Sequence, residues 1–111
     1  MTSYETHSEI QRLFDEMYAA INIIPDLVVA MSHKKGEYGI IKEQEIRTLR
    51  EGKIPVTLIK DYLEGNVDVM TALGEYRYKE ALIEKNQELI RALKIHIKHL
   101  MQQEEFERRG Q

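Results

Sequence analysis

The sequence predicts an all-α protein, a helical bundle of four to five helices that ends in one long helix. Three observations support this: a heptad repeat in the C-terminal part, helix-capping motifs and prolines before it, and a composition of 42% hydrophobic and 32% charged residues. With 111 residues the chain is expected to form a single helical domain, 1–111. We expect N-terminal helices within 1–33, two short helices within 40–65 and the long helix at about 67–108.

The first helix has a clear start and a clear end. Thr6-x-x-Glu9 and Ser8-x-x-Gln11 both have the pattern of a capping box, which predicts a start near residue 7 or 9. Pro25 lacks a backbone N–H, so it ends or kinks this helix at about the residues before it. A short apolar helix is expected next, and the pattern fits either one kinked helix or two helices.

Glycine and proline divide the middle of the chain. The polar residues 33–39 include two glycines and predict a loop. A helix is expected from about residue 40 until Gly52 stops it. Another short helix is expected to begin at Pro55 and to end at Gly65. Its predicted inner face consists of Val56, Ile59, Tyr62 and Leu63.

The last segment has no proline, and Gly74 is its only glycine before the C-terminus. Its residues follow a heptad pattern with two inward positions, a and d. The a positions hold Val69, Tyr76, Ile83, Ile90 and Ile97, and the d positions hold Ala72, Lys79, Asn86, Leu93 and Leu100. The polar d residues, Lys79 and Asn86, allow two interpretations. They either lie buried and fix the register and oligomeric state, or they lie at the edge of the stripe and face water.

The length of this helix predicts self-association. About 42 helical residues span about 63 Å, whereas a compact chain of this size has a radius of gyration of about 13 Å. Either the helix breaks near Gly74, or the N-terminal helices fold back along it, or a second chain covers it. We favour a homo-oligomer, a dimer. The expected interface is the long-helix stripe: Ile83, Leu89, Ile90, Leu93, Ile97 and Leu100.

No residue pattern predicts catalysis, so we expect a protein that is not an enzyme and has no cofactor. There is no cysteine, which excludes disulfides and thiol chemistry. His96-x-x-His99 places two imidazoles on one helix turn, but a metal site needs further ligands, and we expect none. The carboxylates alternate with lysines, as on a solvated helix face.

The N-terminal residues and the apolar runs predict a cytoplasmic protein with no membrane partner. The first residues have neither a basic nor an apolar segment of the kind found in signal peptides. The longest apolar run, residues 23–31, contains Pro25 and Asp26 and is too short to span a bilayer.

Residues 45–73 suggest an alternative function, a helix-turn-helix-like DNA-binding regulator. A helix, a glycine turn, a short helix, a second glycine turn and a third helix match that spacing. The expected phosphate contacts are Arg47, Arg50, Lys53 and Lys60. A net charge of −3 argues against strong binding to phosphates, and a helical corner in a bundle explains the same pattern.

The stretch from Leu49 to Thr57, with Asp61 and Gly65 after it, resembles a family of small helical proteins encoded by phages and prophages of Gram-positive bacteria. Their genes lie among early genes for replication and recombination. The similarity continues from Tyr78 to about residue 104. The family has no established activity, so the resemblance implies a setting and transfers no catalytic residue. The leading hypothesis is a non-enzymatic phage-type accessory protein that acts by binding another protein, in DNA metabolism or host takeover.

Overall fold

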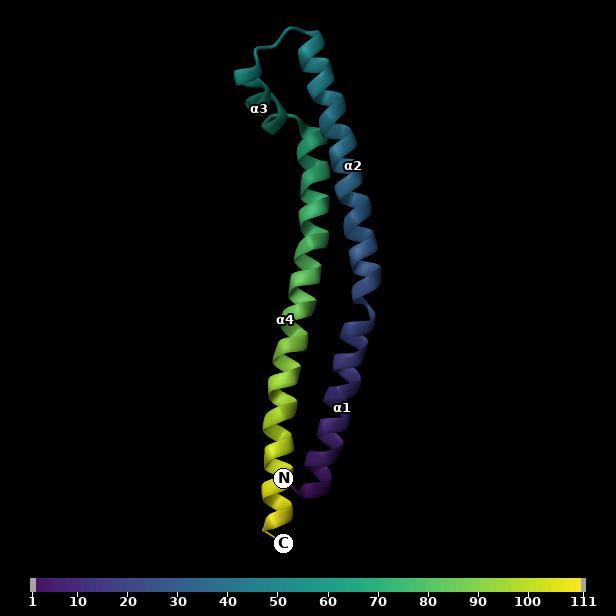
Figure 1. Ribbon diagram of the computed structural model, residues 1–111, viewed down its shortest axis with the longest axis vertical. Coiled ribbons are helices and arrows are strands. Elements are labelled where there is room, and N and C mark those ends of the chain that lie inside the picture. Colours follow the sequence, from purple (N-terminus) through teal and green to yellow (C-terminus); the bar gives the residue numbers. More distant parts are fainter. Residues whose placement is uncertain (1, 111) are drawn as a thin grey trace. The chain divides into compact units, whose positions relative to one another are not determined.

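A computed structural model describes residues 2–110 of the chain. Within these residues it contains four α-helices and no strand (Figure 1). The predictions of an all-α protein and of a long C-terminal helix are therefore confirmed. The helices are α1 (Ser3–Asn22), α2 (Ile24–Glu51), α3 (Val56–Glu64) and α4 (Val67–Arg109).

The chain divides into two compact units. Unit 1 combines the N-terminal segment, Met1–Pro25, with the C-terminal segment, Ile83–Gln111. Unit 2 is the continuous segment between them, Asp26–Leu82. Helix α4 contributes to both units, and each unit has its own set of packed residues.

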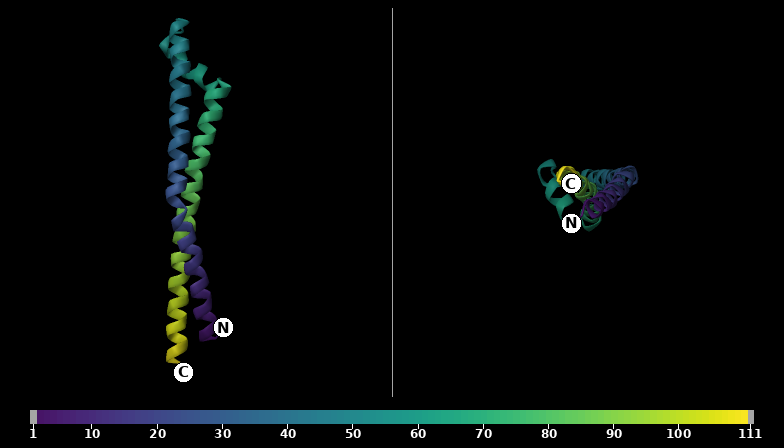
Figure 2. Two further views of the ribbon diagram at one scale, coloured as in Figure 1. Left: turned by 90° about the vertical axis from the view of Figure 1, so that its right-hand side faces the viewer. Right: turned by 90° about the horizontal axis from the view of Figure 1, so that it is seen from below.

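Unit 1 is a pair of antiparallel helices, α1 and the C-terminal part of α4, which lie side by side in the views of Figure 1 and Figure 2. Its core is aliphatic and comes equally from both helices, because each presents apolar side chains at spacings of three and four residues. Each buried leucine or isoleucine side chain contributes roughly 1.5–3 kcal/mol to folding. The core residues are Ile10, Leu13, Met17, Ala20, Ile90, Leu93, Ile97 and Leu100.

This packing answers two of the questions that the sequence left open for the long helix, namely whether it breaks near Gly74 and whether the N-terminal helices fold back along it. Helix α4 continues through Gly74 without a break, and α1 folds back along its C-terminal part. Four residues of the long-helix stripe are therefore covered within the chain, at exposures of 8% or less. Of the other two, Ile83 is half-buried and Leu89 is 40% exposed. A second chain is not needed to cover the four buried residues, and the homodimer stays a prediction.

Polar side chains also connect the helices of unit 1. Thr6 is fully buried, and its hydroxyl lies 3.1 Å from a carboxylate oxygen of Glu107. The amide nitrogen of Asn86 donates to the backbone carbonyl of Ala20, in the last turn of α1. Carbonyls at a helix end have no partner inside the helix, so the Asn86 amide satisfies one of them.

The start of α1 differs from the prediction. The helix begins at Ser3, one turn earlier than expected, because Thr2-x-x-Glu5 forms the capping box. The Glu5 backbone N–H donates to the Thr2 hydroxyl oxygen (3.1 Å), and the Thr2 N–H donates to the Glu5 carboxylate (3.2 Å). Thr6 was expected to cap the helix, but its side chain is buried against α4 instead. The predicted end is confirmed, since α1 ends at Asn22 and Pro25 lies in the first turn of a separate helix.

Unit 2 contains most of α2, all of α3 and the N-terminal part of α4. The predicted loop over 33–39 is wrong, because α2 runs through it, and the helix expected from residue 40 is the C-terminal part of α2. Contacts to α4 hold this segment in a helix. The Lys34 ammonium lies 3.3 Å from Glu75, and the ring of Tyr38 stacks on Tyr76 at 6.4 Å between centroids. These contacts offset the cost of a glycine inside a helix, about 1 kcal/mol for each, at least in part.

The short helix α3 matches its predicted bounds, with Pro55 before it and Gly65 after it. Its predicted inner face is only partly confirmed. Ile59 is buried and Leu63 is half-buried, whereas Val56 is 80% and Tyr62 49% exposed. A helix of nine residues buries only one face. Here Ile59 lies on that face and packs toward α2 and α4.

Replacing the two glycines in α2 tests its continuity. An added Cβ would meet no atom within 4 Å at Gly36 or at Gly39. We expect Gly36→Ala and Gly39→Ala each to raise the free energy of unfolding by about 0.5–1 kcal/mol, because alanine loses less backbone entropy in a helix. Urea denaturation followed by circular dichroism measures this. A loss of stability in both variants would contradict a helix here.

A charge at Leu93 tests whether α1 covers the stripe. Leu93 is 6% exposed, and Ile95 on the same helix is 59% exposed. We expect Leu93→Asp to lower the free energy of unfolding by more than about 3 kcal/mol, because it buries a charge and removes an apolar side chain. The matched variant Ile95→Asp should change it by less than about 1 kcal/mol. Equal effects of the two substitutions in urea denaturation would show that the stripe is not covered.

Candidate functional site

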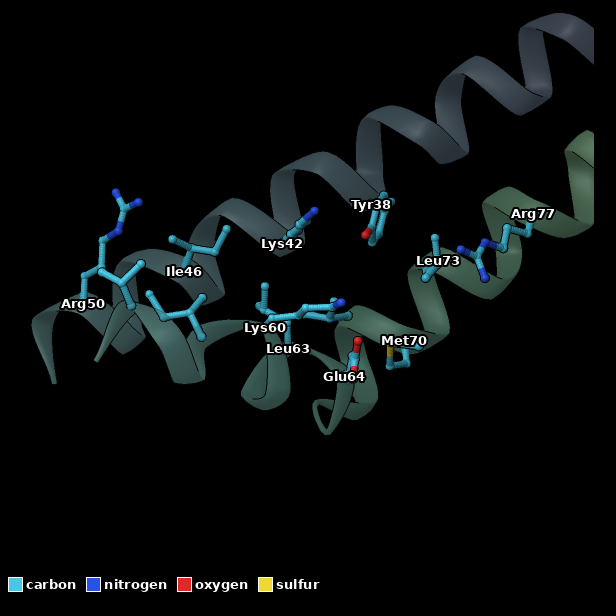
Figure 3. Close-up of a pocket in the computed structure, with 13 residues that line it drawn as sticks. Tyr38, Lys42, Ile46, Arg50, Lys60, Leu63, Glu64, Met70, Leu73 and Arg77 are labelled. Carbon is cyan, nitrogen blue, oxygen red and sulfur yellow. The ribbon is translucent and has the colours of Figure 1, made fainter. Parts of the chain in front are cut away.

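A hollow lies inside unit 2, among α2, α3 and the first turns of α4 (Figure 3). Its volume is about 600 Å³, in the range of sites that bind a small molecule or a few side chains. We call it the α3 pocket. Its wall is lined by Tyr38, Lys42, Ile46 and Arg50 of α2, by Val56, Ile59, Lys60, Leu63 and Glu64 of α3, and by Val69, Met70, Leu73 and Arg77 of α4.

Two tight turns position α3 across the pocket. At the end of α2, the Ile54 N–H donates to the Leu49 carbonyl and the Lys53 N–H donates to the Arg50 carbonyl, both at 3.0 Å. This is a Schellman motif, which closes a helix with one residue in the left-handed region. That residue is Lys53, at φ 59°, a conformation in which a side chain is strained. After α3, the side-chain oxygen of Asn66 accepts from the backbone N–H of Val69 (3.0 Å) and caps α4.

The floor of the pocket is apolar. Ile59 and Val69 are buried at 8% and 2% exposure, and three further aliphatic residues beside them are half-buried. A nine-residue helix is too short to cover the facing parts of both longer helices, so apolar surface stays open between them. The half-buried residues of the floor are Ile46, Leu63 and Leu73.

The rim of the pocket is basic. Four of its side chains are cations and one, Glu64, is an anion. Within residues 2–110, none of these cations has a carboxylate within ion-pair distance. Figure 3 shows Lys60 extending from α3 into the space between α2 and α4, and Arg77 pointing toward that space, whereas Arg50 points away. The four cations are Lys42, Arg50, Lys60 and Arg77.

Aromatic and charged contacts hold α2 against α4 beside the pocket. Tyr38, which lines the pocket, stacks on Tyr76, and the Lys42 ammonium lies 5.6 Å from the Tyr38 ring centroid. The Tyr76 hydroxyl donates to Glu80 (3.1 Å), and this hydrogen bond raises the pKa of Tyr76 above its ordinary value. One turn away, hydrogen bonds to Glu37 and then to Glu75 raise the pKa of Lys34. Both shifts favour the protonated forms that make these contacts.

Five large apolar side chains are exposed on α3 and on the first turn of α4. Protein surfaces that expose several large apolar groups close together often bind another protein. Two of the residues, Val56 and Met70, also line the pocket. The set, which we call the α3 patch, comprises Val56 (80% exposed), Leu58 (43%), Tyr62 (49%), Val67 (77%) and Met70 (40%).

The structure brings together two of the four residues expected to contact DNA. Arg50 and Lys60 line the α3 pocket. Arg47 lies outside it and pairs with Glu43 at 3.1 Å, and Lys53 occupies the turn before α3. The long-helix stripe contributes no residue to the pocket, since its four buried members form the core of unit 1.

Sequence reasoning missed Tyr38, Lys42 and Arg77. Tyr38 and Lys42 are four residues apart, as are Leu73 and Arg77, so each pair lies on one face of a helix. This spacing was a usable signal. For Tyr38 and Lys42 the loop predicted over 33–39 concealed it, because the spacing has meaning only if α2 is already helical there.

Among residues 2–110 there is no cluster of three or more side chains able to hold a metal ion, and both His96 and His99 are exposed. Over the same residues no helix combines the length and the apolar character that crossing a bilayer requires.

The strained turn before α3 generates a prediction. We expect Lys53→Gly to raise the free energy of unfolding by about 1 kcal/mol, because glycine adopts a positive φ without a clash. Lys53→Ala removes the same charge but keeps the Cβ, so it should bring no gain. If both variants gain equally in thermal denaturation, the lysine charge and not the backbone is responsible.

Comparison with protein-family models, with curated proteins and with solved structures gives no match to this chain.

Proposed function

We propose that this protein is a non-enzymatic accessory protein that acts by binding another protein through the α3 pocket and the α3 patch. The observation that carries the proposal is the α3 pocket itself: an open apolar floor inside unit 2, lined in part by the exposed side chains of Val56 and Met70. Exposure of an apolar surface to water is unfavourable, so a partner that covers this surface lowers the free energy of the complex.

The residue types around the pocket support a protein partner. Tyrosine, methionine and arginine are enriched in the centres of protein interfaces, and tyrosine and arginine often contribute most of the binding energy. The α3 pocket and the α3 patch contain all three: Tyr62, Met70, Arg50 and Arg77. Their side chains come from α2, α3 and α4, so a partner would contact three helices at once.

The resemblance to phage and prophage proteins adds a setting to this proposal. The similar stretch, Leu49 to Gly65, is the segment that builds the Schellman turn and α3. We therefore propose that the partner is a host or phage protein of replication, recombination or defence. The protein would act in the cytoplasm of the host cell.

A second candidate function is binding of DNA as a regulator. It is favoured by the order of elements over residues 45–73, where the end of α2, the short α3 and the start of α4 have helix-turn-helix spacing. It is disfavoured by the first turn of α4, which presents Val67, Asp68 and Met70 in place of hydrogen-bond donors for base edges.

Site-specific cross-linking tests the protein-binding proposal. Tyr62, in the α3 patch, and Tyr78, outside it, are exposed tyrosines of unit 2, at 49% and 62%. We replace each in turn by a photoreactive phenylalanine derivative and irradiate extract of the producing cells. We expect a discrete covalent adduct with one protein from position 62 and none from position 78, because only position 62 lies at the proposed interface.

The same experiment has outcomes against the proposal. Equal adducts from both positions, or none from position 62, would contradict an interface at α3. Tight binding of labelled duplex DNA in fluorescence anisotropy, lost with rising salt and in Lys60→Glu, would favour the regulator instead.

A further inference from the structure

We infer that the α3 pocket recognises an acidic, amphipathic segment of its partner protein, which places one large apolar side chain in the cavity and its carboxylates against the basic rim. This inference rests on the proposed function and specifies the chemistry of the partner. It follows from the charge of the rim, the apolar floor and the positions of the cations.

Charge complementarity identifies the sign of the partner. The whole chain has a net charge of −3, yet the lining of the pocket carries four cations and a single carboxylate. Cations without carboxylate partners inside the chain attract anions from outside, and complementary charge raises the rate and the specificity of association. An acidic segment is therefore favoured over a basic or neutral one.

The floor requires an apolar group as well. The cavity of about 600 Å³ is lined by the aliphatic side chains of Ile59, Leu63 and Leu73, and a polar side chain placed against them would lose water without compensation. Leucine, phenylalanine or methionine fits these demands. Buried anchors of this kind, surrounded by a polar rim, are the usual centre of a protein interface.

The placement of the cations favours a peptide over a small inorganic anion. A phosphate or sulfate is held by donors that converge on one point. In Figure 3, Lys60 reaches toward the middle of the pocket from α3, Arg77 from α4, and Arg50 stands apart at the end of α2. Cations that are spread around an apolar floor can pair with carboxylates that are spread along a peptide, on both sides of the apolar residue that enters the cavity.

The experiment selects peptides from a displayed random library on the full-length protein and measures the binding of a selected, fluorescently labelled peptide by anisotropy. We expect enrichment of sequences with several Asp or Glu residues around one large apolar residue. Affinity should fall by about tenfold between low and physiological salt, because ion pairs at the rim are screened.

Two variants and a matched control locate the binding site. Lys60 lines the pocket and Lys35 does not, and both are exposed lysines of unit 2, so Lys60→Glu and Lys35→Glu change the net charge equally. We expect Lys60→Glu to weaken binding by more than about tenfold and Lys35→Glu by less than about twofold. Met70→Trp, at a lining residue that is 40% exposed, should weaken binding similarly by filling the cavity. Circular dichroism checks folding, and Lys60→Gln replaces Lys60→Glu if that variant is unfolded.

Each other outcome overturns the inference in a recognisable way. Selected peptides without an acidic bias, or equal losses in the two lysine variants, would exclude recognition by charge. Acidic peptides that bind Lys60→Glu and Met70→Trp as tightly as the wild type would exclude the pocket. If no peptide is enriched, or if duplex DNA binds and this binding is lost in Lys60→Glu, the acidic segment is excluded. The cross-link at position 62 decides separately whether the proposed protein-binding function survives.

Discussion

The apolar stripe of α4 is the constraint on which both units depend. A helix of 43 residues with inward positions along its whole length must have those positions covered by other parts of the chain. In unit 1 α1 does this with one continuous row of aliphatic contacts, from Ile10 to Ala20. In unit 2 the contact of α2 with α4 is partly polar: Tyr38 of α2 stacks on Tyr76 of α4, and Lys34 of α2 pairs with Glu75. The second covering is less apolar, and the α3 pocket lies within it.

A less apolar covering has consequences for local stability and for function. Regions with few fully buried side chains open at a lower free energy than dense cores, and binding surfaces are often found in them. In unit 2 the fully buried residues are few, namely Leu49, Ile59, Val69 and Ala72. A partner that buries the floor of the pocket would add apolar contacts where unit 2 has least of them, so binding and stability of this unit are coupled by mass action.

The sequence predicted the structural features that depend on residues close to each other in the chain, and it missed those that depend on contacts between distant segments. The end of α1 before Pro25, the end of α2 before Gly52 and the bounds of α3 rest on local chemistry and were predicted. The residue that closes α2 in the left-handed conformation is however Lys53 and not Gly52. The helical segment 33–39 was not predicted, because its glycines favour a loop locally and only contacts to α4, such as the stacking of Tyr38 on Tyr76, make it helical. The pocket was missed for the same reason, since its lining exists only once α2 extends beside α4.

Asn86 shows how a polar residue in the apolar stripe can specify the register of two packed helices. Apolar residues alone would allow several registers of similar energy. Leucine and isoleucine at neighbouring heptad positions are nearly interchangeable, so a shift of α1 by one turn would bury a similar area. The Asn86 amide, half-buried, has its acceptor in the Ala20 carbonyl at the end of α1, and a shift would leave both groups unpaired. This carbonyl lies in the last turn of α1, where the helix leaves carbonyls unpaired. The Asn86 amide at this end of α1 and the Thr6–Glu107 contact at the other end therefore fix the register of the aliphatic core of unit 1.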